Sequence, residues 1–357
     1  MDLSVDLPTR RRYLDAIDAV LTSGLIVNGP DVERCEKQVA AYCGTHDAVG
    51  VGSGTAALYL ALKCLDIGPG DEVILPTLSF VGTANAVAAV GAHPVFVDIR
   101  GDLLMDPDAV EPAITSRTRA IMPVHFTGNV CDMDALLAIG EKRSLPIIED
   151  AAPAFGAVYR EKKAGTFGPL GCFSANPMKV LAGIGEAGFV AVQWAAHSQR
   201  LRELRYHGMR NKELCMEVSL NERLDTIQAA ILSIRLQQIE ESLKRREAIA
   251  GRYAMHLSKI VETPKLAPHV RHAWYHYAIL CDRRDALGVS LAAEGIESRV
   301  YHAKLMPEHA VHARKLDRFP IGRRVVDRIL CLPMHEKLQD EEVDRVSKAV
   351  ARFYGKV

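Results

Sequence analysis

The sequence predicts an α/β protein with a large domain, in which helices wrap a mostly parallel sheet, and a smaller C-terminal α/β domain. Two observations predict this fold class. From Val49 to about Val192, short apolar runs alternate with helix-like segments, which is typical of strands joined by helical crossovers. After residue 220, a long helical pattern precedes shorter strand-like pieces. We therefore expect the large cofactor-binding domain over residues 1–240 and the small domain over residues 241–357.

The predicted strands of the large domain are nearly continuous in apolar residues, as expected where both faces of a sheet are covered. They read D-E-V-I-L-P, H-P-V-F-V-D, R-A-I-M-P-V-H-F, L-P-I-I-E-D, G-C-F-S-A and G-F-V-A-V. Helical patterns such as T-A-A-L-Y-L-A-L-K-C-L and M-D-A-L-L-A-I-G-E-K lie between several of them. In such a sheet, ligands bind at the carboxyl ends of the strands.

The C-terminal part of the chain has a different pattern. One nearly unbroken helical pattern runs from Asp225 to about Leu257, so the predicted domain boundary falls inside or just after this helix. The runs W-Y-H-Y-A-I-L and S-R-V-Y are then strand-like, and a closing amphipathic helix is predicted from Asp340.

The composition excludes several classes of function. Lys and Arg together number 44, as do Asp and Glu, so the formal net charge is zero and lacks the basic excess of a general nucleic-acid-binding protein. The eight cysteines are scattered without a C-x-x-C pair or a zinc-binding pattern, which indicates a reduced protein without a metal site. The amino terminus is too polar for a signal peptide and no apolar run spans a bilayer. We therefore expect a cytoplasmic protein that binds neither nucleic acid nor membranes.

Residues 176–191 read N-P-M-K-V-L-A-G-I-G-E-A-G-F-V-A and contain two competing signals. Gly183, Gly185 and Gly188 have the G-x-G-x-x-G spacing of a dinucleotide-binding turn. Such a turn should precede a helix, and an acidic residue should follow about 20 positions later. Here the strand-like run F-V-A-V follows, and the residue 20 positions beyond Gly188 is Gly208. This context disfavours a nicotinamide-dependent oxidoreductase.

The second signal is Lys179, which stands among mostly apolar or small residues from Phe173 to Leu181. A solvated surface lysine is the plain alternative, because lysines are rarely buried. Removing the amine from water lowers its pKa, and a neutral amine attacks an aldehyde. Lys179 is therefore a candidate nucleophile.

The run I-I-E-D ends at Asp150, which is a candidate partner for a protonated ring nitrogen. A metal-binding acid of a nucleotide hydrolase is one alternative, but the phosphate-loop motif G-x-x-x-x-G-K-[ST] is absent from the sequence. A capping aspartate for the following A-A-P-A segment is the other alternative.

Two further strand ends carry candidate binding residues. In V-G-V-G-S-G-T-A-A-L, Ser53, Gly54 and Thr55 lie where a strand passes into a helix, and a helix N-terminus suits a phosphate, although a plain structural turn also fits. Phe80 follows another strand, where its ring can either stack on a planar ligand or belong to the core. A phosphate site, a stacking ring, a carboxylate and an amine at the strand ends of one sheet together fit pyridoxal phosphate.

These motifs resemble those of the DegT/StrS-type sugar aminotransferases, which are fold-type I enzymes that use pyridoxal 5'-phosphate. The resemblance runs from about residue 15 to the carboxyl terminus and keeps its landmarks in order. They include S-G-L-I-V-N-G-P-D-V, V-G-S-G-T-A-A-L, I-I-E-D-A-A-P-A-F-G-A, F-S-A-N-P-M-K and N-E-R-L-D-T-I-Q-A-A-I. The lysine at position 179 separates these transaminases from related dehydratases, which have a histidine there.

The resemblance implies a role for each candidate residue. Lys179 should form the Schiff base with the cofactor and then move the proton between Cα and C4′, while Asp150 should pair with the pyridine nitrogen. Phe80 should stack on the ring. The residues that should hold the phosphate are Ser53, Gly54, Thr55 and Ser174.

The resemblance also implies an assembly. Asn221 and Arg223 match positions that reach the phosphate region from a partner subunit, so a homodimer with shared active sites is expected. The chain departs from the family at Pro153, where Gln or His is usual. Because proline has no donor to offer, this departure leaves open which group hydrogen-bonds the phenolic oxygen of the cofactor.

The activity that the resemblance implies is ping-pong transamination from glutamate, or glutamine, to a keto-sugar that is usually nucleotide-linked. The segment K-V-L-A-G-I-G-E-A-G and the preceding Pro177 favour the branch that acts on 3-keto sugars. A 4-keto-sugar, other keto-sugar or cyclitol aminotransferase is the alternative, as is a regulatory homologue that binds the cofactor without turnover. The segments R-Y-H-G-M-R, R-H-A-W-Y-H-Y and S-R-V-Y-H-A-K are candidates for binding a diphosphate or an acidic sugar, with a solvated surface as the favoured alternative for most of their residues.

Overall fold

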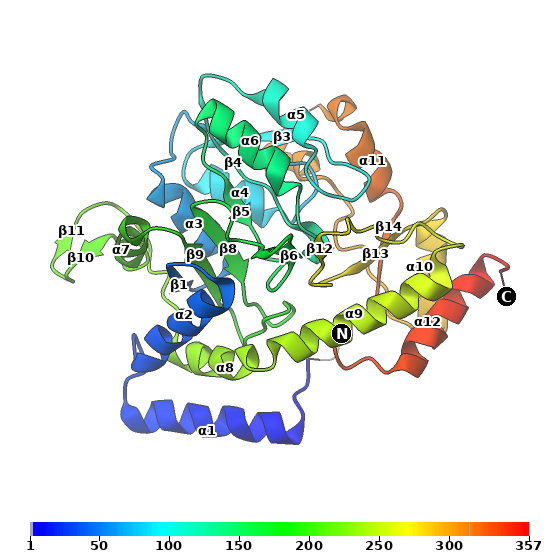
Figure 1. Cartoon of the computed structure of the whole chain (residues 1–357), viewed down its shortest axis with the longest axis horizontal. Coiled ribbons are helices and arrows are strands. Elements are labelled where there is room, and N and C mark those ends of the chain that lie inside the picture. The colour runs from blue at the N-terminus through cyan, green and yellow to red at the C-terminus, as the bar shows by residue number, and fades with distance from the viewer. Residues whose placement is uncertain (1–2, 314, 357) are drawn as a thin grey trace.

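The computed structural model describes residues 3–313 and 315–356, and a mixed sheet lies at its centre (Figure 1). Two groups of hydrogen-bonded strands form this sheet, in the orders β1-β9-β8-β5 and β4-β2-β3. Parallel bridges between Ile121 and Ile147 and between Val124 and Asp150 make the two groups continuous. The strands are β1 (Asp47–Val51), β2 (Glu72–Pro76), β3 (His93–Val97), β4 (Thr118–Ile121), β5 (Ile148–Asp150), β8 (Leu170–Ser174) and β9 (Gly188–Val192).

The pairing of these strands confirms the predicted fold class. The pairs β2–β3, β2–β4 and β5–β8 are parallel, whereas β9 runs antiparallel to both β1 and β8. Every residue of β2, β8 and β9 is buried. Helices on both sides therefore explain why these strands read as continuous apolar runs.

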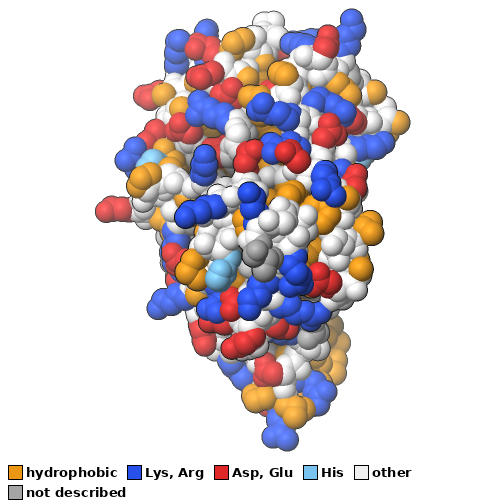
Figure 2. All heavy atoms as spheres, turned by 90° about the vertical axis from the view of Figure 1, so that its right-hand side faces the viewer, with side chains coloured by type: hydrophobic (Ala, Val, Ile, Leu, Met, Phe, Trp, Pro, Cys, Tyr) orange, Lys and Arg blue, Asp and Glu red, His pale blue; other side chains and the backbone are white. Residues whose placement is uncertain are grey.

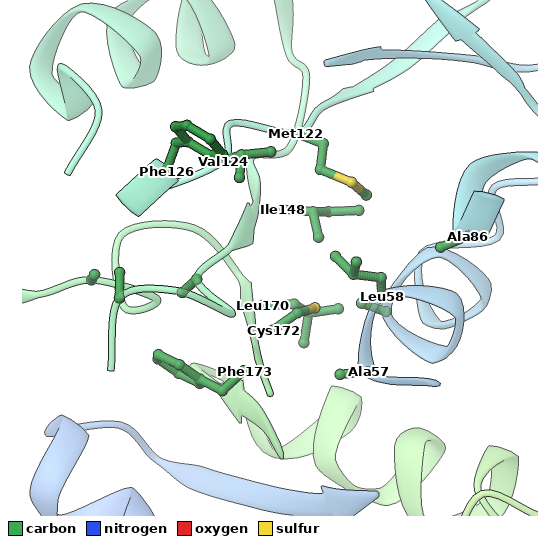
Figure 3. Close-up of a cluster of buried hydrophobic side chains, with 14 of the residues drawn as sticks. Ala57, Leu58, Ala86, Met122, Val124, Phe126, Ile148, Leu170, Cys172 and Phe173 are labelled. Carbon is green, nitrogen blue, oxygen red and sulfur yellow. The ribbon is translucent and has the colours of Figure 1, made fainter. Parts of the chain in front are cut away.

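Helix α3 (Gly54–Cys64) covers one side of the sheet centre. Ser53 begins it, because its Oγ accepts a 3.1 Å hydrogen bond from the N–H of Ala56. The helix is apolar on most sides, as expected for a buried helix. Leu58 of α3 and Leu170 of β8 are both buried in the same core, in which Figure 3 shows them close together. The other helices of this half are α1 (Leu7–Ser23), α2 (Pro30–Cys43), α4 (Gly82–Ala89), α5 (Pro107–Val110), α6 (Met133–Arg143) and α7 (Ala195–Leu204).

The long helical pattern forms two helices, α8 (Thr226–Leu236) and α9 (Ile239–Leu257), which are separated at Gln237 and Gln238. Gln238 leaves the helical region, with φ −103° and ψ 1°. The two helices have different packing partners, because α8 packs on α1 and α2, whereas α9 packs on α12 (Asp340–Phe353). Because of this break, a sequence that reads as one continuous helix forms two helices that pack on different parts of the molecule.

The C-terminal residues form a second cluster of buried apolar side chains. The antiparallel strands β13 (Tyr277–Leu280) and β14 (Ile329–Leu332) contribute to it, together with α9, α12 and α10 (Arg284–Ala293). The helix predicted from Asp340 is confirmed. The run S-R-V-Y is not a strand, because it makes only the bridge between Arg299 and Cys331. The division into residues 1–240 and 241–357 stays a prediction.

Short elements complete the described chain. They are β6 (Val158–Tyr159), β7 (Lys162–Lys163), β10 (Met209–Arg210), β11 (Leu214–Cys215), β12 (Val270–Arg271) and α11 (Pro320–Val326). All eight cysteines are free thiols. None of the helices in the described residues is both long and apolar enough to cross a membrane. On the face in Figure 2, acidic and basic side chains are interspersed, in keeping with the balanced composition.

Candidate active site

A cavity of about 500 Å³ lies at the carboxyl ends of the central strands, where the sequence predicts a ligand site. Part of its lining consists of residues that end or follow strands: Phe80 after β2, Thr127 after β4, Asp150 at the end of β5 and Ser174 at the end of β8. The C-terminal half supplies another part of the lining, namely Tyr275, His276, Tyr301 and His302. The cavity thus lies between the two halves of the chain.

Lys179 lies in the loop after β8. Its backbone N–H donates a 2.8 Å hydrogen bond to the carbonyl of Asn176, and its side chain lines the cavity. The amine nitrogen lies 4.1 Å from the centroid of the Tyr275 ring. Burial lowers the pKa of Lys179 from 10.5 to about 8, although the carboxylates of Asp150 and Glu186 oppose this shift. Lys179 is therefore a cavity residue with a readily deprotonated amine, and not a solvated surface lysine.

Asp150 is only 3% exposed, and it lines the same cavity. Its Oδ2 accepts a 2.7 Å hydrogen bond from the hydroxyl of Thr83, and its Oδ1 accepts a 3.2 Å hydrogen bond from the N–H of Ala152. Burial raises the pKa of Asp150, while these two donors and the nearby charge of Lys179 act to lower it. A cation in the cavity beside this carboxylate would compensate for its burial.

Glu149, the neighbouring carboxylate, serves a different part of the structure. Its oxygens accept hydrogen bonds of 2.7–2.9 Å from the N–H groups of Gly165, Phe167 and Gly168, and it pairs with His125 Nε2 at 2.9 Å. Successive side chains of a strand point to opposite faces, so only one of the two acids can face the cavity. Glu149 is saturated with partners and organises the loop before β8.

The N-terminus of α3 forms a second polar part of the cavity, lined by Ser53, Gly54, Thr55 and Ser174. The N–H groups of Gly54 and Thr55 precede the first helical hydrogen bond, which runs from Ala57 to Ser53. A Cβ on Gly54 would lie 2.7 Å from the Cβ of Ser174, so glycine is needed for the close approach of α3 to the end of β8. Free N–H groups, hydroxyls and the helix dipole together favour a bound anion.

The remaining predicted site residues lie in two places. Phe80 lines the cavity but is 64% exposed, so its ring is free to contact a ligand. Pro153 also lines the cavity. Asn221 and Arg223 do not line it, although Arg223 Nε donates a 2.8 Å hydrogen bond to Asn221 Oδ1. Their predicted contribution from a partner subunit stays a prediction.

Several cavity residues were not predicted individually from the sequence. Thr83 is missed because nothing in the sequence around it shows that its hydroxyl reaches Asp150. For His276 and His302 the solvated-surface alternative is wrong, because both line the cavity and burial lowers their pKa values, that of His302 to about 4. The signal that could have found them is the density of rings in R-H-A-W-Y-H-Y and S-R-V-Y-H-A-K.

The glycine-rich segment does not form a dinucleotide-binding turn. Gly188 begins β9, and a Cβ there would lie 2.5 Å from the carbonyl oxygen of Ser53. Gly183 and Gly185 pack against the side chain of Gln228. These glycines therefore serve close packing around the loop of Lys179.

The donor set of the cavity fits pyridoxal phosphate. The α3 N-terminus suits the phosphate, and the buried Asp150 has no cationic hydrogen-bond partner among the described residues, which a protonated pyridine nitrogen would supply. The low pKa of Lys179 suits an amine that reacts with an aldehyde.

Comparison with known proteins agrees with this chemistry. A family model described as the DegT/DnrJ/EryC1/StrS aminotransferase family matches residues 9–351. The chain is 37% identical to a UDP-N-acetyl-3-dehydro-α-D-glucosamine 3-aminotransferase of Acidithiobacillus ferrooxidans, over 97% of this chain and 94% of the relative. It is 38% identical to a dTDP-3-amino-3,4,6-trideoxy-α-D-glucose transaminase of Streptomyces venezuelae, over 100% of this chain and 96% of the relative.

A solved structure shares the fold as well. The crystal structure of S. venezuelae DesV in complex with a ketimine intermediate superposes with a TM-score of 0.95. The two sequences are 38% identical, and the match covers 98% of this chain and 96% of the DesV chain.

Proposed function

The chain belongs to the DegT/DnrJ/EryC1/StrS aminotransferase family, and we propose that it transfers an amino group from glutamate, or glutamine, to a nucleotide-linked 3-keto sugar in amino-sugar biosynthesis. The observation that carries the proposal is one cavity that combines Lys179, Asp150 and the N-terminus of α3. The 3-keto preference draws on the Lys179 segment and on two relatives that are named for 3-amino sugars.

The family assignment confirms three predictions. The protein is a fold-type I enzyme, its activity is that of an aminotransferase, and its cofactor is pyridoxal 5'-phosphate. The cytoplasmic location, the identity of the sugar and the residue roles below belong to the proposal.

Four groups would hold the cofactor. Ser53, Gly54, Thr55 and Ser174 would bind its phosphate, Asp150 would accept a hydrogen bond from its ring nitrogen, Phe80 would stack on the ring, and Lys179 would bind it covalently. When bound, pyridoxal phosphate supplies an electron sink for the electrons left at the substrate Cα.

The residues of the chain supply the proton transfer. Lys179, whose pKa burial lowers to about 8 in the cofactor-free cavity, would take the proton from Cα of the donor. Asp150 is fixed by hydrogen bonds from Thr83 and the N–H of Ala152, and its carboxylate would keep the ring nitrogen of the cofactor protonated. Tyr275 packs against the Lys179 amine and limits the access of water to it.

A homodimer with shared active sites is part of the same proposal. Helix α1 exposes Leu7, Leu14 and Leu21, which are seven residues apart and therefore share one face. Further exposed apolar side chains lie in the loop after α1 and around the β10–β11 hairpin. They are Leu25, Ile26, Val27, Leu214, Met216, Val218 and Leu220. Surfaces of this kind mark protein–protein contacts, and the last ones are adjacent in sequence to Asn221 and Arg223.

Mixing two inactive variants tests the sharing. If Arg223 serves the partner's cavity, mixed dimers of Lys179→Ala and Arg223→Ala contain one intact site. Refolded mixtures should then regain about a quarter of wild-type turnover, because half the dimers are mixed and each has one working site. A mixture no more active than the separate variants would exclude shared sites.

A half-transamination experiment tests the function itself. The purified protein should show a visible cofactor band that glutamate abolishes and that a nucleotide-linked 3-keto sugar restores. Restoration by 4-keto sugars or cyclitols only would replace the proposed acceptor. A protein that binds the cofactor but does not respond to glutamate or glutamine would be a regulatory homologue.

A further inference from the structure

His276 is a buried histidine in the cavity wall that the proposed function does not yet use. It is 5% exposed, and its ring packs against two tyrosine rings, whose centroids lie 3.9 Å (Tyr275) and 4.1 Å (Tyr301) from its own. Its backbone is fixed as well, because its N–H donates a 3.0 Å hydrogen bond to the carbonyl of Thr127. Two aromatic contacts and a main-chain hydrogen bond therefore restrain the position of His276.

The imidazole of His276 makes no side-chain hydrogen bond to any residue that the structure describes. Other buried histidines nearby are satisfied: His125 pairs with Glu149, and His272 accepts from the N–H of Trp274 and contacts the hydroxyl of Thr127. The ring nitrogens of His276 are not among the fully enclosed side-chain atoms that lack a partner, so they are open to the cavity, where a ligand can supply the missing hydrogen bond.

His276 also contributes to the wall of a second cavity. Together with Tyr301 it lines the cavity of Lys179 and a second cavity of about 290 Å³, which Arg299 and Cys331 also line. His276 and Tyr301 therefore form part of the wall of both cavities.

The His276 ring is not protonated, so it does not act as a cation toward a ligand. Burial lowers the pKa of His276 well below its usual value, and the charges of Lys179, His302 and Arg246 act in the same direction. The ring is therefore neutral at physiological pH and offers one N–H donor and one acceptor nitrogen. A hydroxyl group, which both donates and accepts, matches this pair.

Resting on the function proposed above, we propose that His276 is an acceptor-binding residue that hydrogen-bonds a ring hydroxyl of the keto-sugar and thereby selects hydroxylated over deoxygenated sugars. A site built to hydrogen-bond a substrate hydroxyl rejects an analogue that lacks it, because the polar group of the site then stays unpaired. The two relatives described above differ in this respect, since one is named for a glucosamine and the other for a trideoxy sugar. We therefore expect the acceptor of this chain to be a hydroxylated sugar, as a glucosamine is, and not a deoxygenated one.

Equilibrium binding tests the inference without turnover. The probes are UDP-N-acetylglucosamine, which has no ketone to react, and its 4,6-dideoxy counterpart, each titrated into the holoenzyme by calorimetry. The wild type should bind the hydroxylated probe about tenfold or more tightly than the deoxygenated one. In His276→Leu this preference should fall to less than about threefold, whereas His276→Gln, which keeps a donor and an acceptor, should restore part of it.

A matched control is His93→Leu. His93 is exposed at the start of β3 and lines neither cavity, so this variant should keep the wild-type preference. The visible cofactor band and the thermal midpoint establish that each variant is folded and loaded.

The outcomes separate the inference from the function on which it rests. Equal binding of both probes by the wild type, or an unchanged preference in His276→Leu, would overturn the role of His276 alone. If neither probe binds while glutamate still abolishes the cofactor band, the inference for His276 fails and a UDP-linked acceptor is excluded, whereas the aminotransferase activity stands.

Discussion

The two sides of the end of β5 differ in how completely their polar groups are satisfied. On one side, Glu149 accepts three backbone N–H groups and pairs with His125, whose Nδ1 in turn accepts from the N–H of Cys131. On the cavity side, Asp150 accepts two hydrogen bonds from the part of the chain that the structure describes, neither of them from a cationic group. Both carboxylates are fully or almost fully buried, so burial alone does not distinguish structure from function.

The same contrast separates the lysine and the histidines of the cavity from other buried groups. Lys179 contacts a tyrosine ring, and His276 has no side-chain hydrogen bond to a described residue. A buried polar group that the fold itself satisfies stabilises the structure, whereas one left incomplete in a cavity is available to a ligand. This difference, rather than residue type, marks the candidate active site.

The largest expected effect comes from removing the amine. Lys179→Ala should lower turnover by about 10⁴-fold or more, because covalent binding and proton transfer are lost together. Steady-state assays with glutamate, and the visible absorbance of the purified variant, measure this. A yellow variant with more than a few per cent of wild-type turnover would refute the role of Lys179.

Exchanging each carboxylate for its amide tests the comparison directly. Asp150→Asn should lower turnover by roughly 10²–10³-fold with little loss of stability, because it removes the charge that keeps the ring nitrogen protonated. Glu149→Gln should instead lower the free energy of unfolding by about 2–4 kcal/mol, since it unbalances a saturated buried network. Denaturant titration and turnover per folded molecule measure the two effects. The reverse pattern would mean that the two acids are assigned to the wrong sides.

The pH dependence of the apoprotein tests the electrostatics of the cavity. Because burial disfavours the charged amine, the pKa of Lys179 is about 8, so its neutral fraction is one half near pH 8 and levels off only about one pH unit above that value. At pH 7 about one amine in ten is neutral, compared with less than one in a thousand for an ordinary lysine. Cofactor capture, trapped with borohydride at each pH, should therefore be half-maximal near pH 8. A rate that keeps rising to pH 10 would show a solvated amine.

The smallest expected effect is that of Thr83. Its hydroxyl donates to Asp150 and lies 3.0 Å from the hydroxyl of Ser79, so it positions the carboxylate. Thr83→Val should lower turnover about tenfold and weaken cofactor binding, in line with the loss of one hydrogen bond to a charged group. Thr83→Ser should recover most of both. An equal loss in the valine and serine variants would point to packing rather than to the hydroxyl.

The sequence predicts the central sheet well, because a strand buried on both faces has a continuous run of apolar residues. The strands β2, β8 and β9 are buried along their whole length in this way. It also predicts which residues stand at the strand ends, such as Asp150 and Ser174. It predicts poorly what depends on distant segments meeting. The break between α8 and α9 follows from two different packing partners, and His276 enters the cavity from more than 90 residues beyond Lys179. A local pattern carries no information on either.

The central claim is that the partly neutral amine of Lys179 in this cavity binds pyridoxal phosphate covalently. Borohydride reduction of the holoenzyme, followed by proteolysis and mass spectrometry of the peptides, tests it most directly. We expect the reduced cofactor on Lys179, and no modification when Lys179→Ala is treated in the same way. A modified peptide that contains another lysine, or an unmodified digest of a yellow protein, would contradict it.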